Sequence, residues 1–223
     1  MKTGLPRGIV FDMDGLMLES EELWSDVDRE VALQYGRSYD PSRKPLFMGC
    51  EKIESARRFR RAYHLTDPPD VIARKRMDLA YRFYRERVRL MPGLAELVSD
   101  LTAWGKPLAV ATSADQEIVR IVRKRFPIFS AFQSVVCADE VEKGKPAPDL
   151  FLEAARRLGI PPSACLVLED SPNGVAAALS AGMKVIGVPH PALDDLQMQG
   201  AHLLVRRLAE VSRERIELLF RDP

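Results

Sequence analysis

The chain has 223 residues, of which 46% are hydrophobic and 29% charged, a balance that excludes an intrinsically disordered protein. The length suits one large globular domain or a medium domain carrying an insertion. A net charge of +1 gives no general attraction to nucleic acid or to an anionic membrane. No apolar run approaches the ~18 residues that span a bilayer, and no signal-peptide pattern is present. We therefore expect a cytoplasmic protein with no nucleic-acid or membrane partner. The oligomeric state does not follow from composition, and our expectation is a monomer or weak dimer.

Cysteine and histidine give no sign of a redox or metal site. Cys50, Cys137 and Cys165 form no C-x-x-C pair, and the last two lie inside apolar runs. We expect them to be small, buried and reduced side chains. The three histidines are scattered along the chain without the spacing of metal ligands.

Five short apolar runs are nearly continuous rather than alternating, which is typical of strands buried on both faces of a parallel sheet. These runs are Gly8–Asp12, Pro107–Thr112, Ser134–Ala138, Cys165–Asp170 and Lys184–Pro189. Helical patterns separate the later runs, at Gln116–Arg125, Pro148–Leu158 and Asn173–Ala181, and glycine stop signals follow the last two. Repeated strand–helix–strand units predict an α/β domain with a doubly wound parallel sheet.

The stretch between the first two predicted strands has helical periodicity instead. One apolar face contains Leu23, Val27 and Val31, and a second contains Val71, Met77, Ala80 and Tyr84. Only the end of this stretch, Gly93–Trp104, has the pattern of an ordinary crossover helix. We therefore expect a core domain of residues 1–15 and 93–223, with a small all-helical domain of residues 16–92 inserted after the first strand.

The predicted insertion is rich in arginine. One cluster contains Arg57, Arg58, Arg60 and Arg61, and the other contains Arg82, Arg85, Arg87 and Arg89. Contact with nucleic acid is one interpretation. Interleaved acidic residues and a nearly neutral chain favour a solvated surface instead.

The first strand ends in the sequence FDMDG. Asp12 and Asp14 are two residues apart, so an extended chain points both carboxylates in the same direction. Gly15 then permits a sharp turn. Two adjacent carboxylates favour a cation between them, and a site of oxygen ligands favours Mg²⁺. The alternative is a turn that carries two solvated acids.

Polar residues follow three later strands or loops. Thr112 and Ser113 end the second strand, where hydroxyl and backbone N–H groups suit a phosphate oxygen or merely cap the next helix. Lys145 lies in a proline-braced loop, where it either faces a phosphate or is a surface lysine. Glu169 and Asp170 end the fourth strand, where they either complete a metal site or cap a helix. Because open α/β sheets bind ligands at the carboxyl ends of their strands, these groups are expected at one edge.

Four motifs, FDMDG, ATSA, GKPAPD and LEDSPNG, occur in this order over the whole chain. Together they resemble the haloacid dehalogenase superfamily, in its phosphate-handling subfamily I with a helical cap after the first motif. Within it, the chain resembles phosphatases of the pseudouridine-5′-phosphatase and 2-deoxyglucose-6-phosphatase type, and more distantly the β-phosphoglucomutases. One departure is Glu19, where the family more often has aspartate, which leaves the choice of substrate open.

The resemblance implies a role for each residue of the motifs. Asp12 would be the nucleophile that forms an aspartyl-phosphate, and Asp14 the general acid and base. Mg²⁺ would be held by Asp12, the Asp14 backbone carbonyl and Asp170. Thr112 and Lys145 would bind the phosphoryl oxygens. The backbone N–H groups of Ser113 and Ala114 would assist, and Glu169 would orient Lys145 or a metal-bound water.

The resemblance also implies that the inserted domain selects the substrate. Residues 16–20 and 91–93 would form its hinge, and Glu19, Trp24, Gly49 and Lys52 would face the leaving group. Trp24 is equally explained as a core aromatic residue. The expected reaction is Mg²⁺-dependent hydrolysis of a small phosphorylated metabolite, either a sugar phosphate or a nucleotide; the alternative is a β-phosphoglucomutase-like phosphomutase.

Other enzyme classes lack their motifs in this sequence. No G-x-G-x-x-G follows the first strand, as a nicotinamide-dependent dehydrogenase requires, and the GK of the third motif is followed by Pro146 rather than by the Ser or Thr of a P-loop. A haloalkanoic acid dehalogenase would share the nucleophile without needing Asp14 or the magnesium ligands. A non-enzymatic interaction protein would need none of these polar strand ends.

Overall fold

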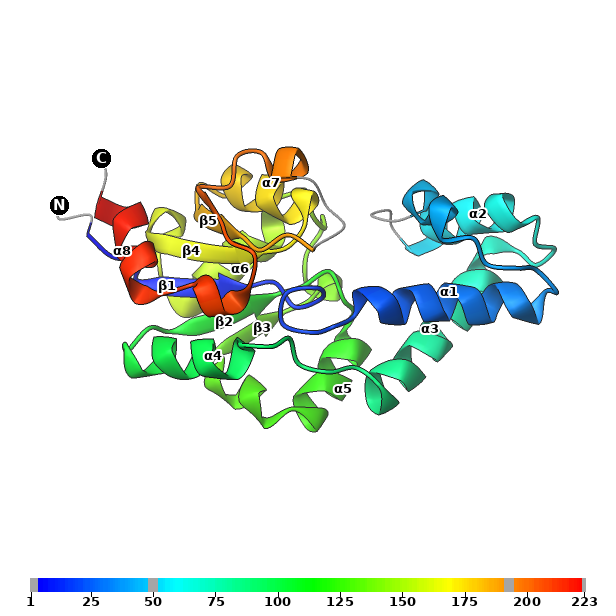
Figure 1. The fold of residues 1–223 in the computed structure, drawn as a ribbon, viewed down its shortest axis with the longest axis horizontal. Helices are drawn as coiled ribbons and strands as arrows, with labels where there is room; N and C mark the ends of the chain where they lie inside the picture. The colour runs from blue at the N-terminus through cyan, green and yellow to red at the C-terminus, as the bar shows by residue number, and fades with distance from the viewer. Residues whose placement is uncertain (1–3, 48–51, 191–194, 222–223) are drawn as a thin grey trace. The chain divides into compact units, whose positions relative to one another are not determined.

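The computed structural model describes residues 4–47, 52–190 and 195–221 (Figure 1). The chain forms two compact units. We call residues 1–19 with 89–223 the sheet unit, and residues 20–88 the helical unit. Each unit is described by itself.

The sheet unit is built on a parallel sheet with the strand order β3-β2-β1-β4-β5-β6. The strands are β1 Gly8–Phe11, β2 Leu108–Ala111, β3 Ser134–Val136, β4 Cys165–Glu169, β5 Lys184–Gly187 and β6 Leu203–Leu204. The predicted doubly wound parallel sheet is confirmed, and each expected strand ends one or two residues before the end of its apolar run. The sixth strand, β6, is missing from the sequence prediction because it contains only two half-buried residues.

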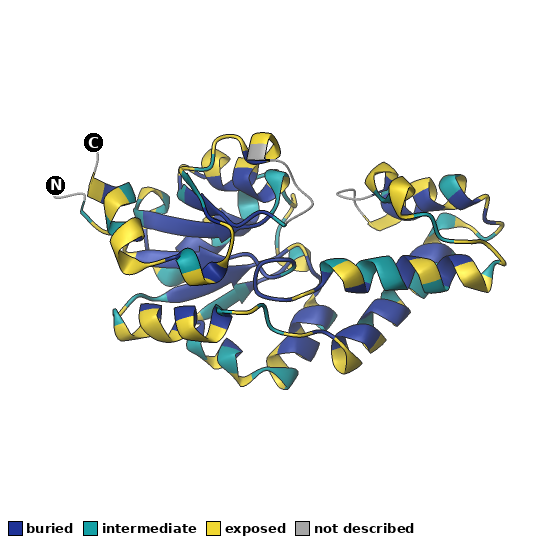
Figure 2. Cartoon of the chain, viewed as in Figure 1, coloured by how far each residue is buried: buried dark blue, intermediate teal, exposed yellow. Residues whose placement is uncertain are grey.

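Helices cover both faces of this sheet. They are α4 Leu94–Ala103, α5 Gln116–Arg125, α6 Asp149–Leu158, α7 Pro172–Ser180 and α8 Arg213–Arg221. α6 contacts β1, β2 and β3, and α7 contacts β4 and β5. Figure 1 shows α4 and α5 on the side of the sheet opposite α7. The central strands are therefore buried from both sides, as Figure 2 shows.

Alternation along β1 divides the core between the two faces. Val10 packs into a cluster with residues of α6 and α7, including Phe151 and Val175. Phe11 points to the other face, where its ring lies edge to face with Phe132 at a centroid distance of 5.4 Å. A strand buried on both faces explains why its sequence is apolar at every position. Cys137 and Cys165 are buried free thiols, and Cys50 lies outside the described residues.

The helical unit contains α1 Glu21–Gln34, α2 Lys52–Tyr63 and α3 Pro69–Glu86. α3 contacts both other helices, so its buried surface is wider than a single stripe. Val71 and Met77 are only half-buried, although the periodicity placed them on the apolar face. The buried residues of α3 are Ile72, Ala73, Leu79, Ala80, Phe83 and Tyr84.

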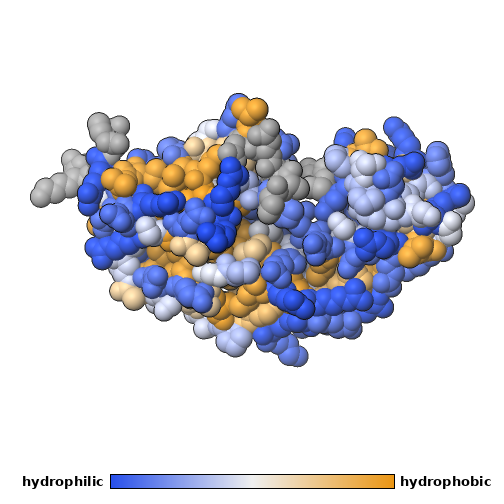
Figure 3. All heavy atoms as spheres, in the orientation of Figure 1, coloured by the Kyte–Doolittle hydropathy of each residue, from blue (hydrophilic) through white to orange (hydrophobic). Residues whose placement is uncertain are grey.

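Many arginines of the helical unit pair with acidic side chains of the same unit. Arg57 and Arg58 both contact Glu54, and Arg82 contacts Glu30 at 2.6 Å. In Figure 3 the visible face of the helical unit is largely hydrophilic. These pairs are typical of a solvated surface. In the described part of the chain, no helix has the length and apolar character needed to cross a membrane.

Candidate active site

Neighbouring strands bring polar side chains to the carboxyl edge of the sheet. Asp12 follows β1, Thr112 follows β2, and Glu169 and Asp170 lie at the end of β4. Because the strand order is β2-β1-β4, these residues are neighbours in space. Their exposed fractions are 6%, 0%, 0% and 5% in that order. Buried polar groups need partners, and those partners define the site.

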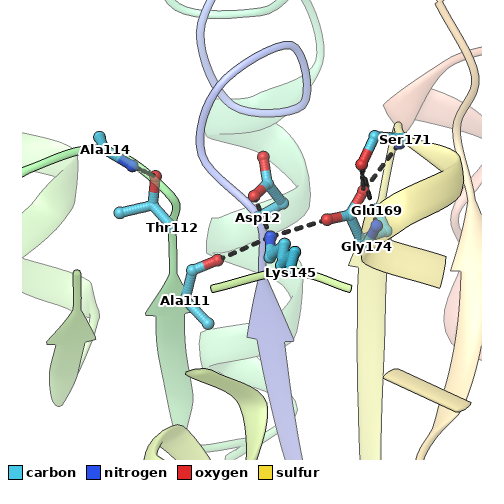
Figure 4. Close-up of polar contacts among 8 residues, drawn as sticks. All are labelled: Asp12, Ala111, Thr112, Ala114, Lys145, Glu169, Ser171 and Gly174. Carbon is cyan, nitrogen blue, oxygen red and sulfur yellow. Dashed lines mark hydrogen bonds and ion pairs between the residues drawn. The ribbon is translucent and has the colours of Figure 1, made fainter. Parts of the chain in front are cut away.

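Lys145 reaches this edge from the loop between β3 and α6 (Figure 4). Its Nζ donates to Asp12 Oδ1, to Glu169 Oε1 at 2.7 Å and to the carbonyl oxygen of Ala111 at 3.1 Å. The ammonium also lies 4.8 Å from the ring centroid of Phe151 on α6. Three acceptors match the three N–H bonds of an ammonium, so this charge is fixed at the end of β1.

The ionisation of Asp12 and Lys145 is linked. Burial, together with the neighbouring carboxylates of Glu169 and Asp14, raises the pKa of Asp12 to about 8 against the attraction of Lys145. Burial opposes the charge on Lys145, but Asp12 and Glu169 outweigh burial and raise the pKa of its ammonium above its ordinary value. Lys145 therefore stays charged. Further positive charge at this edge would favour the ionised form of Asp12.

Thr112 organises the turn between β2 and α5. Its Oγ1 accepts a hydrogen bond from the backbone N–H of Ala114 at 3.0 Å, as Figure 4 shows. A hydroxyl that accepts this bond retains its own proton for donation. The side chain of Asp115 accepts from the N–H of Ile118 and caps α5, and Ser113 is exposed between these two turns. The Ala114 N–H assigned to phosphate is thus already bonded within the turn.

The sequence that forms this site matches a known protein family. The family model described as "Haloacid dehalogenase-like hydrolase" matches residues 9–188, which include every strand end described above. The chain belongs to the haloacid dehalogenase-like hydrolases. The resemblance drawn from the four motifs is therefore confirmed.

Named relatives span nearly the whole chain. A Drosophila melanogaster protein named provisionally as a pseudouridine-5′-phosphatase is 39% identical, with 94% of this chain and 93% of that protein aligned. The fructose-1-phosphate phosphatase of Escherichia coli (strain K12) is 32% identical over 81% of this chain and 95% of its own length. A crystal structure from Thermotoga maritima, named provisionally as a β-phosphoglucomutase, has a TM-score of 0.77 at 31% identity, covering 92% of this chain and 95% of that one.

The buried acids fit a cation in this haloacid dehalogenase-like site. Asp12, Glu169 and Asp170 each offer a carboxylate oxygen, and these oxygens lie within 4.8 Å of one another. Glu169, however, already uses Oε1 for Lys145 and Oε2 for Ser171. Asp12 and Asp170 are therefore the better side-chain ligands for a metal. Their oxygen chemistry suits Mg²⁺.

Gly15 and Asp170 meet across the turn after β1. Gly15 has φ +84°, and a Cβ built on it would lie 2.1 Å from Asp170 Oδ2. The turn is closed by a hydrogen bond from the Gly15 N–H to the carbonyl oxygen of Leu18 at 3.0 Å. Asp14, which precedes this glycine, is half-buried and lies near enough to Asp12 to raise its pKa. Glycine is thus required both by its backbone conformation and by the carboxylate beside it.

The residues expected to face the leaving group are distributed over both units. Glu19 is exposed on the sheet unit, where its N–H donates to the carbonyl oxygen of Arg89 at 3.0 Å. Trp24 is half-buried in the helical unit, with its ring edge to face with Tyr84 at 6.4 Å. Lys52 begins α2 and is exposed, and Gly49 lies outside the described residues. A contact of these residues with substrate stays a prediction.

Two residues of the site were not predicted from the sequence. Ser171 donates from both its backbone N–H and its Oγ to Glu169 Oε2, at 2.7 and 2.9 Å. Gly174 lies directly against the same carboxylate. Both belong to the fourth motif, LEDSPNG, whose acids alone were interpreted. The sequence signal that could have revealed this role is a serine in the position of a helix N-cap, two residues after the acid that ends a buried strand.

Proposed function

We propose that this chain is a Mg²⁺-dependent phosphatase that hydrolyses a small phosphate monoester, a sugar phosphate or a nucleotide, through an aspartyl-phosphate on Asp12. The observation that carries this proposal is the Lys145 ammonium held between Asp12 and Glu169 at the end of β1. Such an arrangement places a carboxylate nucleophile beside a fixed positive charge, as phosphoryl transfer requires. The phosphatase names of the relatives support the same reaction.

In the first step, a carboxylate oxygen of Asp12 attacks phosphorus and the bond to the leaving oxygen breaks. Asp14 donates a proton to that oxygen, so the alcohol leaves neutral. Lys145 and Thr112 stabilise the charge on the phosphoryl oxygens in the transition state. Bound at Asp12, Asp170 and the carbonyl oxygen of Asp14, Mg²⁺ would supply the positive charge that offsets repulsion between carboxylate and phosphate.

In the second step, Asp14 takes a proton from a water molecule, whose oxygen attacks phosphorus. Inorganic phosphate leaves and the Asp12 carboxylate is restored. Asp14 is therefore protonated before the first step and ionised after it, and the second step protonates it again. Substrate selection would come from the helical unit, which carries Trp24 and Lys52.

The proposal is tested by measuring phosphate release from sugar phosphates, nucleotides and an aryl phosphate in the presence of Mg²⁺. Turnover with any of them supports the enzyme, and the preferred compound identifies the substrate class. Absence of phosphate release across the panel would contradict a phosphatase and favour an interaction protein.

A phosphomutase is the second candidate, because a structural relative carries the name β-phosphoglucomutase. By the family resemblance, those mutases use a cap histidine ten residues beyond the second aspartate to activate the accepting hydroxyl. Trp24 occupies that position here and can neither accept nor deliver that proton. The only histidine between residues 16 and 92 is His64, which directly follows α2 rather than lying on α1.

We therefore expect β-glucose 1-phosphate, supplied with a trace of the 1,6-bisphosphate, to yield free phosphate rather than glucose 6-phosphate. The two products are followed separately. Glucose 6-phosphate that forms much faster than phosphate would establish the mutase. In that case Lys52 or Glu19 would be the first residues to replace in search of the missing acid–base group.

Replacing Gly15 with alanine is expected to raise the Mg²⁺ concentration that activity requires and to lower the free energy of unfolding. The left-handed backbone costs about 1–2 kcal/mol for a residue with a Cβ, and the new methyl group displaces the Asp170 carboxylate. We expect the Mg²⁺ concentration for half-maximal activity to rise about 10-fold or more. Gly105→Ala is the matched control in the same unit, since it has φ +73° and open space around it.

Urea unfolding and Mg²⁺ titration of both variants separate the two effects. Gly105→Ala should lose stability and keep the wild-type Mg²⁺ requirement. Equal Mg²⁺ requirements in Gly15→Ala and wild type would show that Asp170 is not a ligand.

A further inference from the structure

The Glu169 carboxylate is held from both sides. Oε1 accepts from Lys145 Nζ at 2.7 Å, while Oε2 accepts from the N–H and the Oγ of Ser171 at 2.7 and 2.9 Å (Figure 4). The same Oγ accepts from the backbone N–H of Gly174 at 3.1 Å. The Ser171 hydroxyl therefore donates to the carboxylate and caps α7 at the same time. The carboxylate itself is fully buried.

Gly174 provides the space in which this carboxylate lies. A Cβ built on Gly174 would lie 1.6 Å from Glu169 Oε1 and 1.8 Å from its Cδ. No side chain fits there while Glu169 keeps its position. Because Gly174 is in the first turn of α7, the beginning of this helix and the orientation of Glu169 are fixed together.

We propose that Ser171 and Gly174 are positioning residues, which orient Glu169 and through it the Lys145 ammonium at Asp12. The hydrogen bonds of the Ser171 hydroxyl join it to Glu169 and to the Gly174 N–H, so both residues act on Glu169 rather than on Asp12 directly. Their effect passes along the chain of contacts from Ser171 to Glu169, from Glu169 to Lys145 and from Lys145 to Asp12. This inference rests on the proposed function only for its kinetic test, since the contacts themselves are independent of the reaction.

The first test replaces the Ser171 hydroxyl. Ser171→Ala is expected to lower kcat/KM about 10-fold and to weaken inhibition by vanadate, a mimic of the transferring phosphoryl group, by a similar factor. Ser171→Thr keeps a hydroxyl that donates and accepts, so it should restore both values to within about threefold of wild type.

A matched control removes a different helix cap from the same unit. The hydroxyl of Ser212 accepts from the N–H of Arg215 at 3.3 Å at the start of α8. Ser212→Ala should therefore leave kcat/KM and vanadate inhibition unchanged. A comparable loss in Ser212→Ala, a failure of Ser171→Thr to restore activity, or more than half of wild-type kcat/KM in Ser171→Ala would each overturn the inference.

The second test is structural and does not depend on catalysis. Gly174→Ala is expected to lower kcat/KM about 100-fold, because its methyl group must push the Glu169 carboxylate aside. A crystal structure of this variant should show Lys145 Nζ and Glu169 Oε1 more than about 3.5 Å apart, beyond hydrogen-bonding distance. An unchanged contact would overturn the inference. If the wild-type protein released no phosphate from any substrate, the proposed function would fail. The crystal structure of Gly174→Ala would still decide the positioning role.

Discussion

Replacing Asp12 with asparagine is expected to lower kcat by at least about 10³-fold while the protein stays folded. The amide cannot form the acyl phosphate on which both half-reactions of the proposed mechanism depend. Asparagine has nearly the shape of aspartate and is neutral. It therefore avoids the cost of burying a charge, which is the main reason that the pKa of Asp12 is raised to about 8. Lys145 keeps Glu169 as its partner in this variant.

The measurement is steady-state phosphate release by purified Asp12→Asn protein, with thermal unfolding as the control for folding. Asp26→Asn is a suitable companion variant, because Asp26 is an acid of the helical unit in exposed ion pairs. It should retain wild-type kcat. A folded Asp12→Asn protein with a tenth of wild-type activity would contradict the assignment of the nucleophile.

Removing divalent cations is expected to abolish turnover, and Mg²⁺ should restore it. The buried acids Asp12, Glu169 and Asp170 lie together at one edge, and Lys145 neutralises only part of their charge. Without a cation, the charge on Asp12 is disfavoured and the phosphate is repelled. The measurement is phosphate release after treatment with EDTA, followed by titration with Mg²⁺.

Ca²⁺ should bind the same oxygens and inhibit. It prefers longer bonds and more ligands than Mg²⁺, so it competes for the second oxygen of a carboxylate that must remain available for attack. Full activity in EDTA, or turnover with Ca²⁺ equal to that with Mg²⁺, would contradict the proposed metal site.

The main features of the sheet followed from local sequence. Strands buried on both faces are apolar at nearly every position, so β1, β2 and β4 were recognisable, and the polar residues directly after them marked one edge. β6 was not, because Leu203 and Leu204 alone carry no periodicity. Its position depends on pairing with β5, which is a tertiary interaction.

Within the site, the residue types were predictable but the full set of contacts was not. The acid pair Glu169 and Asp170 was identified from the sequence, and the family resemblance implied that Glu169 orients either Lys145 or a metal-bound water. Nothing in the sequence indicated that Lys145 would take one oxygen of Glu169 while Ser171 held the other. These contacts depend on how the loop before α6 and the start of α7 converge on β4. The role of Gly174 is similarly visible only when the space beside it is known.

The central claim, that Asp12 carries the phosphoryl group, is tested most directly with the Asp14→Asn variant and 4-nitrophenyl phosphate. This substrate has a leaving group that needs no proton, so the first step should proceed without Asp14, whereas hydrolysis of the intermediate should be slow. We predict a burst of about one equivalent of nitrophenol per enzyme and phosphate attached to residue 12 in acid-quenched, digested protein. The burst should disappear in the Asp12→Asn/Asp14→Asn double variant. Absence of a burst during measurable turnover, or phosphate attached to another residue, would contradict the account.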